Sequence, residues 1–260
     1  MDYNYHTHTF RCRHADGLEE EYVVRAIENG VKYMGFSEHV PLKFSDGTQS
    51  WYRLPVEEVQ LYANEVLRLK EKYKDKIEIK LGFECEYYPQ LFDKMYKDVV
   101  SWGAEFLLLG EHFYRPENLN GESRHSSDHE VDDYEGLKNY ADTIVEGIKT
   151  KKFSYVCHPD MISVVGDKKI YQEQMEKICR ASKEYNIPVE INFLGIRENR
   201  RYPNPWFLEV AGKIGCPVTF GLDAHEAKDA YDGASLVKAK ELVKKYNLNY
   251  IGRPKLLPLK

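Results

Sequence analysis

The feature that most limits how this chain can fold is a repeated alternation between short apolar segments and longer segments of helical periodicity. Apolar runs of strand character are expected at 2–8, 32–37, 77–86, 106–112, 154–158, 188–194 and 217–223. Amphipathic stretches predict helices at 18–29, 56–73, 90–101, 132–150, 169–186, 204–214 and 234–246. Seven strand–helix units in series indicate parallel strands joined by right-handed crossovers.

Such units form either a closed barrel or an open doubly wound sheet. No glycine-rich phosphate loop follows the first predicted strand, and polar candidate residues follow nearly every strand rather than one switch point. This pattern predicts an α/β fold of the distorted (β/α)7 TIM-like barrel kind, formed by residues 1–260 as a single domain. The functional site is then expected at the carboxyl ends of the strands.

The amino-acid composition limits which kinds of partner this protein can bind. With 42% hydrophobic and 30% charged residues the chain is typical of a globular domain, and no apolar run approaches the roughly 18–20 residues that span a bilayer. The N-terminus lacks a secretory signal, and the five cysteines lack a C-x-x-C pair, so we expect a cytoplasmic protein with reduced thiols. A net charge of −5 argues against nucleic-acid binding and leaves a small phosphorylated substrate open. The sequence does not distinguish a monomer from a dimer.

Histidines and carboxylates gather where the predicted strands end. His6 and His8 stand two residues apart in the first strand, and side chains at i and i+2 share a face, so both imidazoles can reach one metal ion. Asp223 and His225 repeat this spacing at the last strand. The complete set of candidate metal ligands is His6, His8, His14, His39, Glu84, His112, His158, Asp223 and His225.

The remaining polar residues near the strand ends receive other predictions. His125 and His129 lie in a polar segment and are expected to be in a solvated loop. Three acidic neighbours of the ligands, Glu38, Glu86 and Glu111, could instead hold imidazoles from behind, although Glu38 competes with His39 as a ligand and Glu86 with Glu84. Cys12 lies between two candidate ligands, but we favour a structural thiol.

Seven imidazoles and two carboxylates exceed what one catalytic zinc ion needs. They suit two or three divalent ions, and the abundance of histidine favours Zn, Fe or Mn over Mg or Ca. Metal ions that share ligands activate water and stabilise both the attacking and the leaving oxygen in phosphate-ester hydrolysis.

In the order and spacing of these residues the whole chain resembles the PHP (polymerase and histidinol phosphatase) superfamily. That resemblance implies a distorted (β/α)7 barrel with a trinuclear metal centre. Segment 189–197 and the Tyr202-Pro203 pair are most similar to the histidinol-phosphate phosphatases within it, from which the chain departs at Glu111, where a smaller residue is expected. The implied ligand sets are His6, His8, Glu84 and Asp223 for one ion, Glu84, His112 and His158 for a second, and His14, His39 and His225 for a third.

The same resemblance implies hydrolysis of L-histidinol phosphate in histidine biosynthesis by attack of a metal-bridging hydroxide. Glu84 and Asp223 then act as catalytic metal ligands, and Arg197 neutralises phosphoryl charge. Asp160 would protonate the leaving group or bind the substrate's ammonium group, unless it caps the following turn, and Glu117 would add negative charge at the rim. Segments 40–54 and 113–131 are long enough to form walls over the metals.

Two other functions are compatible with the sequence. One is a PHP-type phosphoesterase acting on nucleotides or nucleic-acid ends, which the acidic pI of about 6.0 disfavours for extended nucleic acid. The other is a metal-binding or regulatory module without catalytic activity, which the full number of candidate ligands disfavours.

Overall fold

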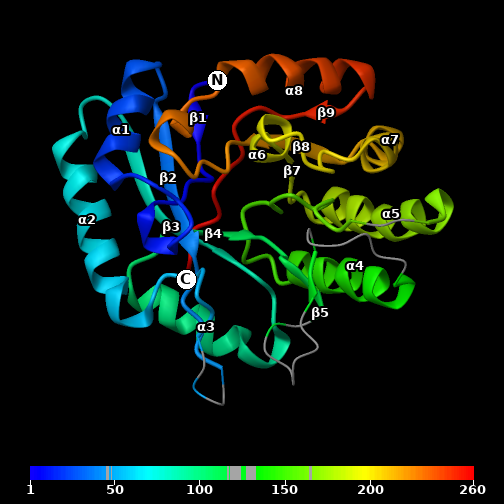
Figure 1. The fold of residues 1–260 in the computed structure, drawn as a ribbon, viewed down its shortest axis with the longest axis horizontal. Helices are drawn as coiled ribbons and strands as arrows, with labels where there is room; N and C mark the ends of the chain where they lie inside the picture. Colours follow the sequence, from blue (N-terminus) through cyan, green and yellow to red (C-terminus); the bar gives the residue numbers. More distant parts are fainter. Residues whose placement is uncertain (45–46, 48, 116, 118–123, 127–132, 164–165) are drawn as a thin grey trace.

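The computed structural model describes residues 1–260 except 45–46, 48, 116, 118–123, 127–132 and 164–165. Its helices lie around the outside of a group of strands and follow one another in chain order (Figure 1). Among the described helices, none combines the length and the apolar character that a bilayer span requires.

The strands of the main sheet are parallel and belong to two ladders. The first runs in the order β1 (Tyr3–Asn4), β2 (Tyr33–His39), β3 (Glu78–Cys85) and β4 (Phe106–Leu109). The second contains β7 (Val189–Asn192), β8 (Pro217–Gly221) and the short β9 (Asn249–Tyr250).

Isolated bridges join the two ladders into a ring. Val156 pairs with Leu109 of β4 on one side and with Val189 of β7 on the other. On the far side, Thr7 bridges Ala224, where the His8 amide donates to the Ala224 carbonyl at 2.9 Å. Backbone pairing therefore continues around seven positions, and the predicted (β/α)7 barrel is confirmed.

Two predicted strands are reduced to two residues or fewer. The first strand, expected over 2–8, keeps regular pairing only at Tyr3–Asn4, because polar side chains replace backbone acceptors beyond it. The amide of Thr7, for example, donates to the Ser37 hydroxyl at 3.0 Å. The fifth strand, expected over 154–158, is reduced to the bridge at Val156, and the backbone turns into the left-handed region at His158, with φ 27°.

All seven predicted helices are present within a few residues of their expected bounds. They are α1 (Glu19–Glu28), α2 (Val59–Lys72), α3 (Pro89–Ser101), α4 (Tyr134–Lys149), α5 (Lys168–Tyr185), α7 (Pro205–Ile214) and α8 (Gly233–Lys245). α2 shows why: its buried face carries the apolar side chains, and a short 3-10 turn, η2 (Val56–Glu58), leads into it from Pro55.

Several short elements were not predicted. α6 (Phe193–Arg197) starts directly after β7, where the Asn192 side chain accepts the amide of Gly195. β5 (Phe113–Arg115) and β6 (Arg124–His125) pair antiparallel in the region expected to be a long loop. Two further 3-10 turns are η1 (Phe10–Cys12) and η3 (Ala227–Ala230).

Candidate metal centre

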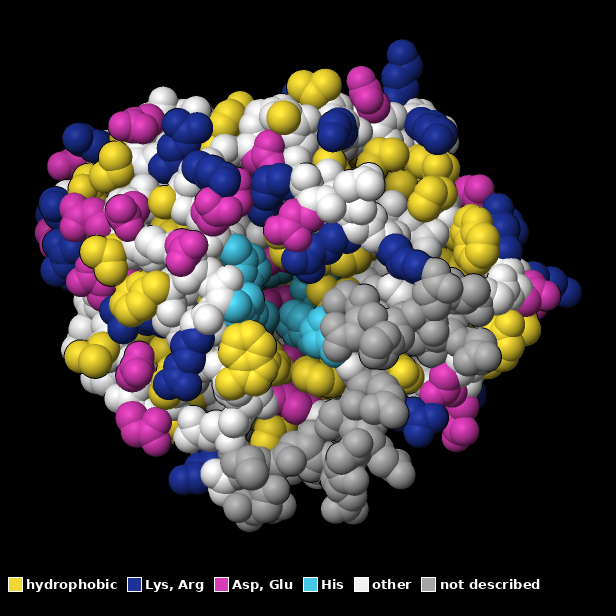
Figure 2. Space-filling view, viewed as in Figure 1, with side chains coloured by type: hydrophobic (Ala, Val, Ile, Leu, Met, Phe, Trp, Pro, Cys, Tyr) yellow, Lys and Arg dark blue, Asp and Glu magenta, His cyan; other side chains and the backbone are white. Residues whose placement is uncertain are grey.

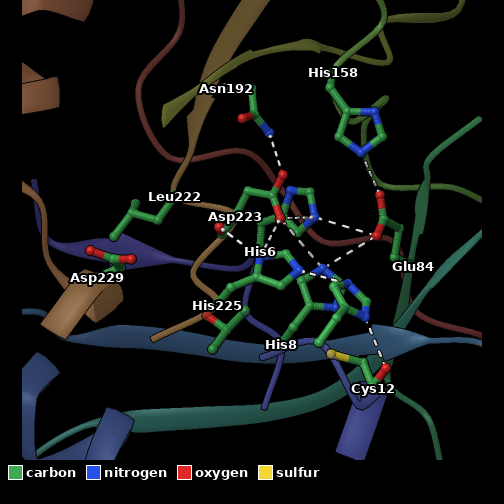
Figure 3. A network of polar contacts seen from close by, with 12 residues as sticks. His6, His8, Cys12, Glu84, His158, Asn192, Leu222, Asp223, His225 and Asp229 are labelled. Atoms are coloured by element: carbon green, nitrogen blue, oxygen red, sulfur yellow. Dashed lines mark hydrogen bonds and ion pairs between the residues drawn. The ribbon is translucent and has the colours of Figure 1, made fainter. Parts of the chain in front are cut away.

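Four candidate ligands from three places in the chain meet at the carboxyl ends of the strands (Figure 3). Nε2 of His6 lies 3.5 Å from Oε2 of Glu84 and 3.4 Å from Oδ1 of Asp223. Nε2 of His8 lies 3.3 Å and 3.5 Å from the same two oxygens. These four residues, which we call the floor of the site, are between 0% and 3% exposed.

The floor atoms lack ordinary hydrogen-bond partners. Nε2 of His6, Nε2 of His8 and Oε2 of Glu84 are buried and make no hydrogen bond. Buried polar atoms are nearly always satisfied, so such a convergent group needs a shared partner. A divalent cation fits, because imidazole nitrogens and carboxylate oxygens are its usual ligands and all face one point.

The two oxygens of Glu84 face different groups of imidazoles. Oε2 is near His6 and His8 and lies 3.2 Å from Nδ1 of His39. Oε1 lies 2.8 Å from Nε2 of His158 and 3.6 Å from Nε2 of His112. Although burial favours the protonated form, the charges of His112, His6 and His158 hold the pKa of Glu84 well below its usual value.

The outer candidate ligands lie nearer to solvent. His14 and His225 approach to 3.1 Å between their Nε2 atoms. The rings of His39 and His225 both stack on the ring of His8, with centroids 4.3 Å and 4.5 Å from it. His8 thus adds to the expected group of His14, His39 and His225. Cys12 is buried, its thiol donates to the Thr9 carbonyl, and burial raises the pKa of that thiol.

Three of the imidazoles have a carboxylate near Nδ1, the ring nitrogen that faces away from the floor. Oε1 of Glu190 lies 2.8 Å from Nδ1 of His6, and Oε1 of Glu86 lies 2.7 Å from Nδ1 of His112. Oε2 of Glu38 lies 3.8 Å from Nδ1 of His8. Such partners fix the ring orientation of a metal ligand. Glu86 and Glu38 were expected here.

Glu190 was missed, although an acidic residue inside the apolar strand 188–194 is a signal that could have identified it. Glu111, the third expected partner, is buried, and burial together with the charge of Glu86 raises its pKa well above the usual value. Burial opposes ionisation of Glu86 as well, but Arg53 and His112 lower its pKa to about 2.

Two glycines leave room for the carboxylates. A Cβ added at Gly110 would lie 2.0 Å from Oε1 of Glu84, and one added at Gly221 would lie 1.5 Å from Oε1 of Glu190. Asp223 itself has φ 47°, in the left-handed region, and its Oδ2 accepts the Asn192 side chain at 3.0 Å. The backbone at the end of β8 is thus shaped to point this carboxylate at the floor.

A cavity of about 470 Å³ opens over these residues. Figure 2 shows histidine side chains inside a hollow, with basic and apolar side chains at its edge. Its lining includes six of the candidate ligands, one of them Asp223, and also Trp51, Tyr52, Phe113, His125, Met161, Leu194, Glu198 and Arg200. Segment 40–54 thus supplies part of the wall, as expected.

The structure does not place Arg197 where phosphate would bind. Its guanidinium donates to the carbonyls of Leu222 and Asp223 and forms ion pairs at 3.2 Å with Asp229 and Asp232. It is also absent from the cavity lining. Arg197 therefore supports the turn that carries Asp223.

Arg200, three residues further along the chain, does line the cavity. It forms an ion pair with Glu198 at 2.6 Å and donates to the Tyr202 hydroxyl at 3.0 Å. The five-residue helix α6 explains why Arg200 and not Arg197 lies at the cavity, because it turns Arg197 back toward β8 before the chain reaches Arg200.

Asp160 and Glu117 also lie behind the cavity wall. Asp160 is 2% exposed and accepts the amide of Asn204, the N-cap of α7, and burial raises its pKa to about 7. This contact ties Asp160 to the start of α7, 44 residues away in the sequence, whereas the expected alternatives were leaving-group protonation, ammonium binding and a cap on the following turn. Glu117 is 6% exposed and paired with Arg53, so it does not present free negative charge at the rim.

The prediction for His125 was wrong. It belongs to β6, its ring centroid lies 6.1 Å from that of His112, and it lines the cavity. An antiparallel pairing across a long insertion leaves little periodicity in the sequence, so this position could not be recognised. His129 lies outside the described residues.

Comparisons with known proteins agree with this geometry. A family model described as PHP domain matches residues 4–193. A histidinol-phosphatase from Bacillus subtilis is 23% identical over 86% of this chain and 93% of its own length, and one from Lactococcus lactis is 25% identical over 94% and 90%. The crystal structure of a histidinol phosphate phosphatase from Lactococcus lactis, complexed with zinc, L-histidinol and phosphate, has the same fold, with a TM-score of 0.69, 21% identity and coverage of 96% of this chain and 95% of that one.

Proposed function

We propose that this chain, which belongs to the PHP domain family, is a metal-dependent histidinol-phosphatase of histidine biosynthesis. It hydrolyses L-histidinol phosphate to L-histidinol and inorganic phosphate. The observation that carries the proposal is the convergence of nine candidate ligands on Glu84 and its surroundings, in a chain that aligns with named histidinol-phosphatases over nearly their whole length.

Three groups of residues would hold divalent ions, for which Zn, Fe and Mn are the candidates. His6, His8, Glu84 and Asp223 form the floor group; Glu84, His112 and His158 form the second; and His14, His39 and His225, with His8 adjacent, form the third. Glu84 suits a bridging role, since its two oxygens face different imidazoles. When bound, such ions lower the pKa of water and neutralise charge on phosphoryl oxygens.

The cavity lining gives the substrate residues. Arg200 is the arginine at the cavity, and its planar fork suits a phosphate monoester. Glu198, its partner, carries the negative charge that an ammonium group needs, and Trp51 and Phe113 offer aromatic surface for an imidazole ring. A cavity of about 470 Å³ is within the range usual for small-molecule sites.

The reaction requires the residues to hold the phosphate ester so that its phosphorus–oxygen bond to the alcohol is in line with the attacking water. The phosphorus–oxygen bond to the alcohol breaks, the oxygen of water joins phosphorus, and the alcohol leaves with a proton. The buried floor excludes other water, and Glu190, Glu38 and Glu86 keep the imidazoles in fixed orientations. We place this reaction in the cytoplasm, in keeping with five cysteines that are all unpaired.

The test is phosphate release by protein of measured metal content from four substrates: L-histidinol phosphate, p-nitrophenyl phosphate, AMP and an oligonucleotide with a terminal phosphate. We expect kcat/KM for histidinol phosphate to exceed the others by at least about 100-fold, in line with charge-assisted recognition at both ends of the substrate. A preference for AMP or the oligonucleotide would establish the nucleotide alternative instead. No turnover by metal-replete protein would reject phosphatase function.

A further inference from the structure

Arg53 is a buried cation that connects an inserted segment to the metal centre. It is 2% exposed and lies at the end of the wall segment 40–54. Its Nη1 lies 2.8 Å from Oε2 of Glu86 and donates to the Val40 carbonyl at 3.2 Å. Its Nη2 and Nε contact the carboxylate of Glu117. One guanidinium thus holds two buried carboxylates, and the planar fork of its N–H donors suits such paired contacts.

The contact with Glu86 continues to a candidate metal ligand. While Oε2 of Glu86 faces Arg53, its Oε1 lies 2.7 Å from Nδ1 of His112. The chain of contacts therefore runs from Arg53 through Glu86 to His112, whose Nε2 faces Glu84. A movement of Arg53 would alter the carboxylate that orients this imidazole.

The contact with Glu117 continues to the substrate side of the cavity. The hydroxyl of Tyr52, a cavity-lining residue, donates to Glu117 at 3.0 Å and lies 3.4 Å from an oxygen of Glu86. The guanidinium carbon of Arg53 lies 5.0 Å from the centre of the Tyr52 ring. That ring in turn packs edge-on to His39, with centroids 5.3 Å apart. The same cation therefore supports the cavity wall.

The other two carboxylates behind imidazoles are held differently. Glu190 accepts the side chain of Asn192, two residues along the same strand, and the amide of His158. Glu38 accepts the amide and hydroxyl of Thr9, next to the imidazole that it supports. In both pairs the described donors are neutral and belong to the strand ends of the barrel. The Glu86–His112 pair instead depends on a charged residue from an insertion.

We propose that Arg53 is a positioning residue that fixes His112 through Glu86 and the cavity wall through Glu117 and Tyr52, so that one insertion sets both metal affinity and substrate affinity. This proposal rests on the proposed metal site and not on the identity of the substrate. Replacing an arginine with a merely structural role would change metal affinity and KM together, whereas this proposal assigns the two effects to different contacts. The Glu86 side governs metal affinity, and the Glu117 side governs KM.

The experiment compares Glu117→Gln, Glu86→Gln, Arg53→Lys and the double variant Arg53→Met/Glu117→Gln. The double variant removes one positive and one negative charge, which avoids leaving Glu117 buried without a partner. Zinc affinity is measured by competition with a chromophoric chelator, and kcat and KM are measured with the preferred phosphate ester. Far-UV circular dichroism and thermal melting check the fold.

We expect Glu117→Gln to raise KM several-fold with zinc affinity unchanged. Glu86→Gln and the double variant should lose about 10- to 100-fold in affinity at the weakest zinc site, the range typical of lost partners of metal-bound histidine. Compared with the double variant, Arg53→Lys should recover part of the zinc affinity but should keep a raised KM. Lysine retains the positive charge but lacks the planar fork of the guanidinium.

Equal zinc affinity in the double variant and in Glu117→Gln would overturn the proposal. If the double variant does not fold, Glu86→Gln decides, and wild-type zinc affinity there would also overturn it. The zinc titrations require no substrate. Failure of the histidinol-phosphatase assay would therefore leave this test intact, and failure of this test would leave that assay unaffected.

Discussion

The floor of the metal centre and the mouth of its cavity are built in different ways. The floor residues, His6, His8, Glu84 and Asp223, are at most 3% exposed, and they belong to strand ends or follow them directly. At the mouth, which we define as Trp51, Glu198 and Arg200, Trp51 is 66% exposed and the Arg200 side chain 37%. Floor atoms are fixed by buried partners, whereas mouth residues are carried by loops and short turns.

The difference indicates a division of work between chemistry and selection. Because the floor is closed to solvent, its charges interact strongly and tolerate little displacement. Mouth residues interact in a more polar setting, so each contributes less to binding, and a change there should leave the ions in place. Floor variants should therefore lose metal and turnover together, and mouth variants should mainly change substrate affinity.

Replacing Glu84 should have the largest effect. Glu84→Gln removes the negative charge that faces five imidazoles, so we expect loss of bound metal and a fall in kcat of at least about 100-fold, the upper end of the loss seen for mere supporting partners. Elemental analysis and steady-state kinetics measure both. Glu78→Gln, at the solvent-exposed start of the same strand, is the control and should leave both unchanged.

Adding one methyl group beneath the floor should have the next largest effect. In Gly110→Ala the new Cβ would lie 2.0 Å from Oε1 of Glu84, so the carboxylate must move while the backbone can stay. We expect about a 10- to 100-fold fall in kcat/KM and weaker metal retention with a nearly unchanged melting temperature.

The control for Gly110→Ala is Gly233→Ala, whose Cβ would meet the Tyr231 ring only at an ordinary contact distance of 3.4 Å. A fully active Gly110→Ala would show that the floor tolerates displacement and would remove the distinction from the mouth.

The floor was largely predictable from sequence, for physical reasons. Spacing of two residues in a strand fixes a shared face, so His6 with His8 and Asp223 with His225 could be paired from sequence alone. Parallel strands bring their carboxyl ends to one rim, which placed Glu84 and His158 beside them. Glu190 was missed although its charge stands out in an apolar strand, because the sequence does not show that this strand lies beside His6.

The mouth was predicted poorly because it depends on turns with no sequence period. The exchange of Arg197 for Arg200 follows from α6, a helix too short for amphipathic periodicity, which starts at the Asn192 cap. The position of His125 follows from pairing between β5 and β6 across an insertion. Arg53 and Glu117 were separated by 64 residues and carried no common signal.

Replacing Arg200 tests the mouth. In Arg200→Met a charge-assisted contact with phosphate is lost, so we expect a 10- to 100-fold fall in kcat/KM, about the effect of a hydrogen bond to a charged group, expressed mainly as a higher KM. Zinc content should not change. Arg180→Met, an exposed pair with Glu176 on α5, is the matched control. Loss of metal in Arg200→Met would place this arginine with the floor.

Asp160 should give the smallest effect on activity and a clear effect on stability. Burial raises its pKa to about 7, whereas an aspartate in the unfolded chain titrates near 3.9. Between these values the folded protein keeps a proton that the unfolded chain has released. Wild-type stability should therefore fall as pH rises from about 4 to 7 and should lose nothing further from this group above that.

Asp160→Asn should remove this fall in stability with pH. The side-chain oxygen of asparagine can still accept the backbone N–H of Asn204, and the side chain carries no charge to bury. Denaturant unfolding at several pH values from 5 to 8 should show the variant gaining on wild type as pH rises, by an amount on the order of 1–4 kcal/mol, with kcat within about twofold, as expected for a substitution outside the reacting groups. Parallel stability curves would contradict the buried neutral carboxyl. A large loss of kcat at equal stability would instead extend the chemical floor to Asp160, beyond the wall that now separates it from the cavity.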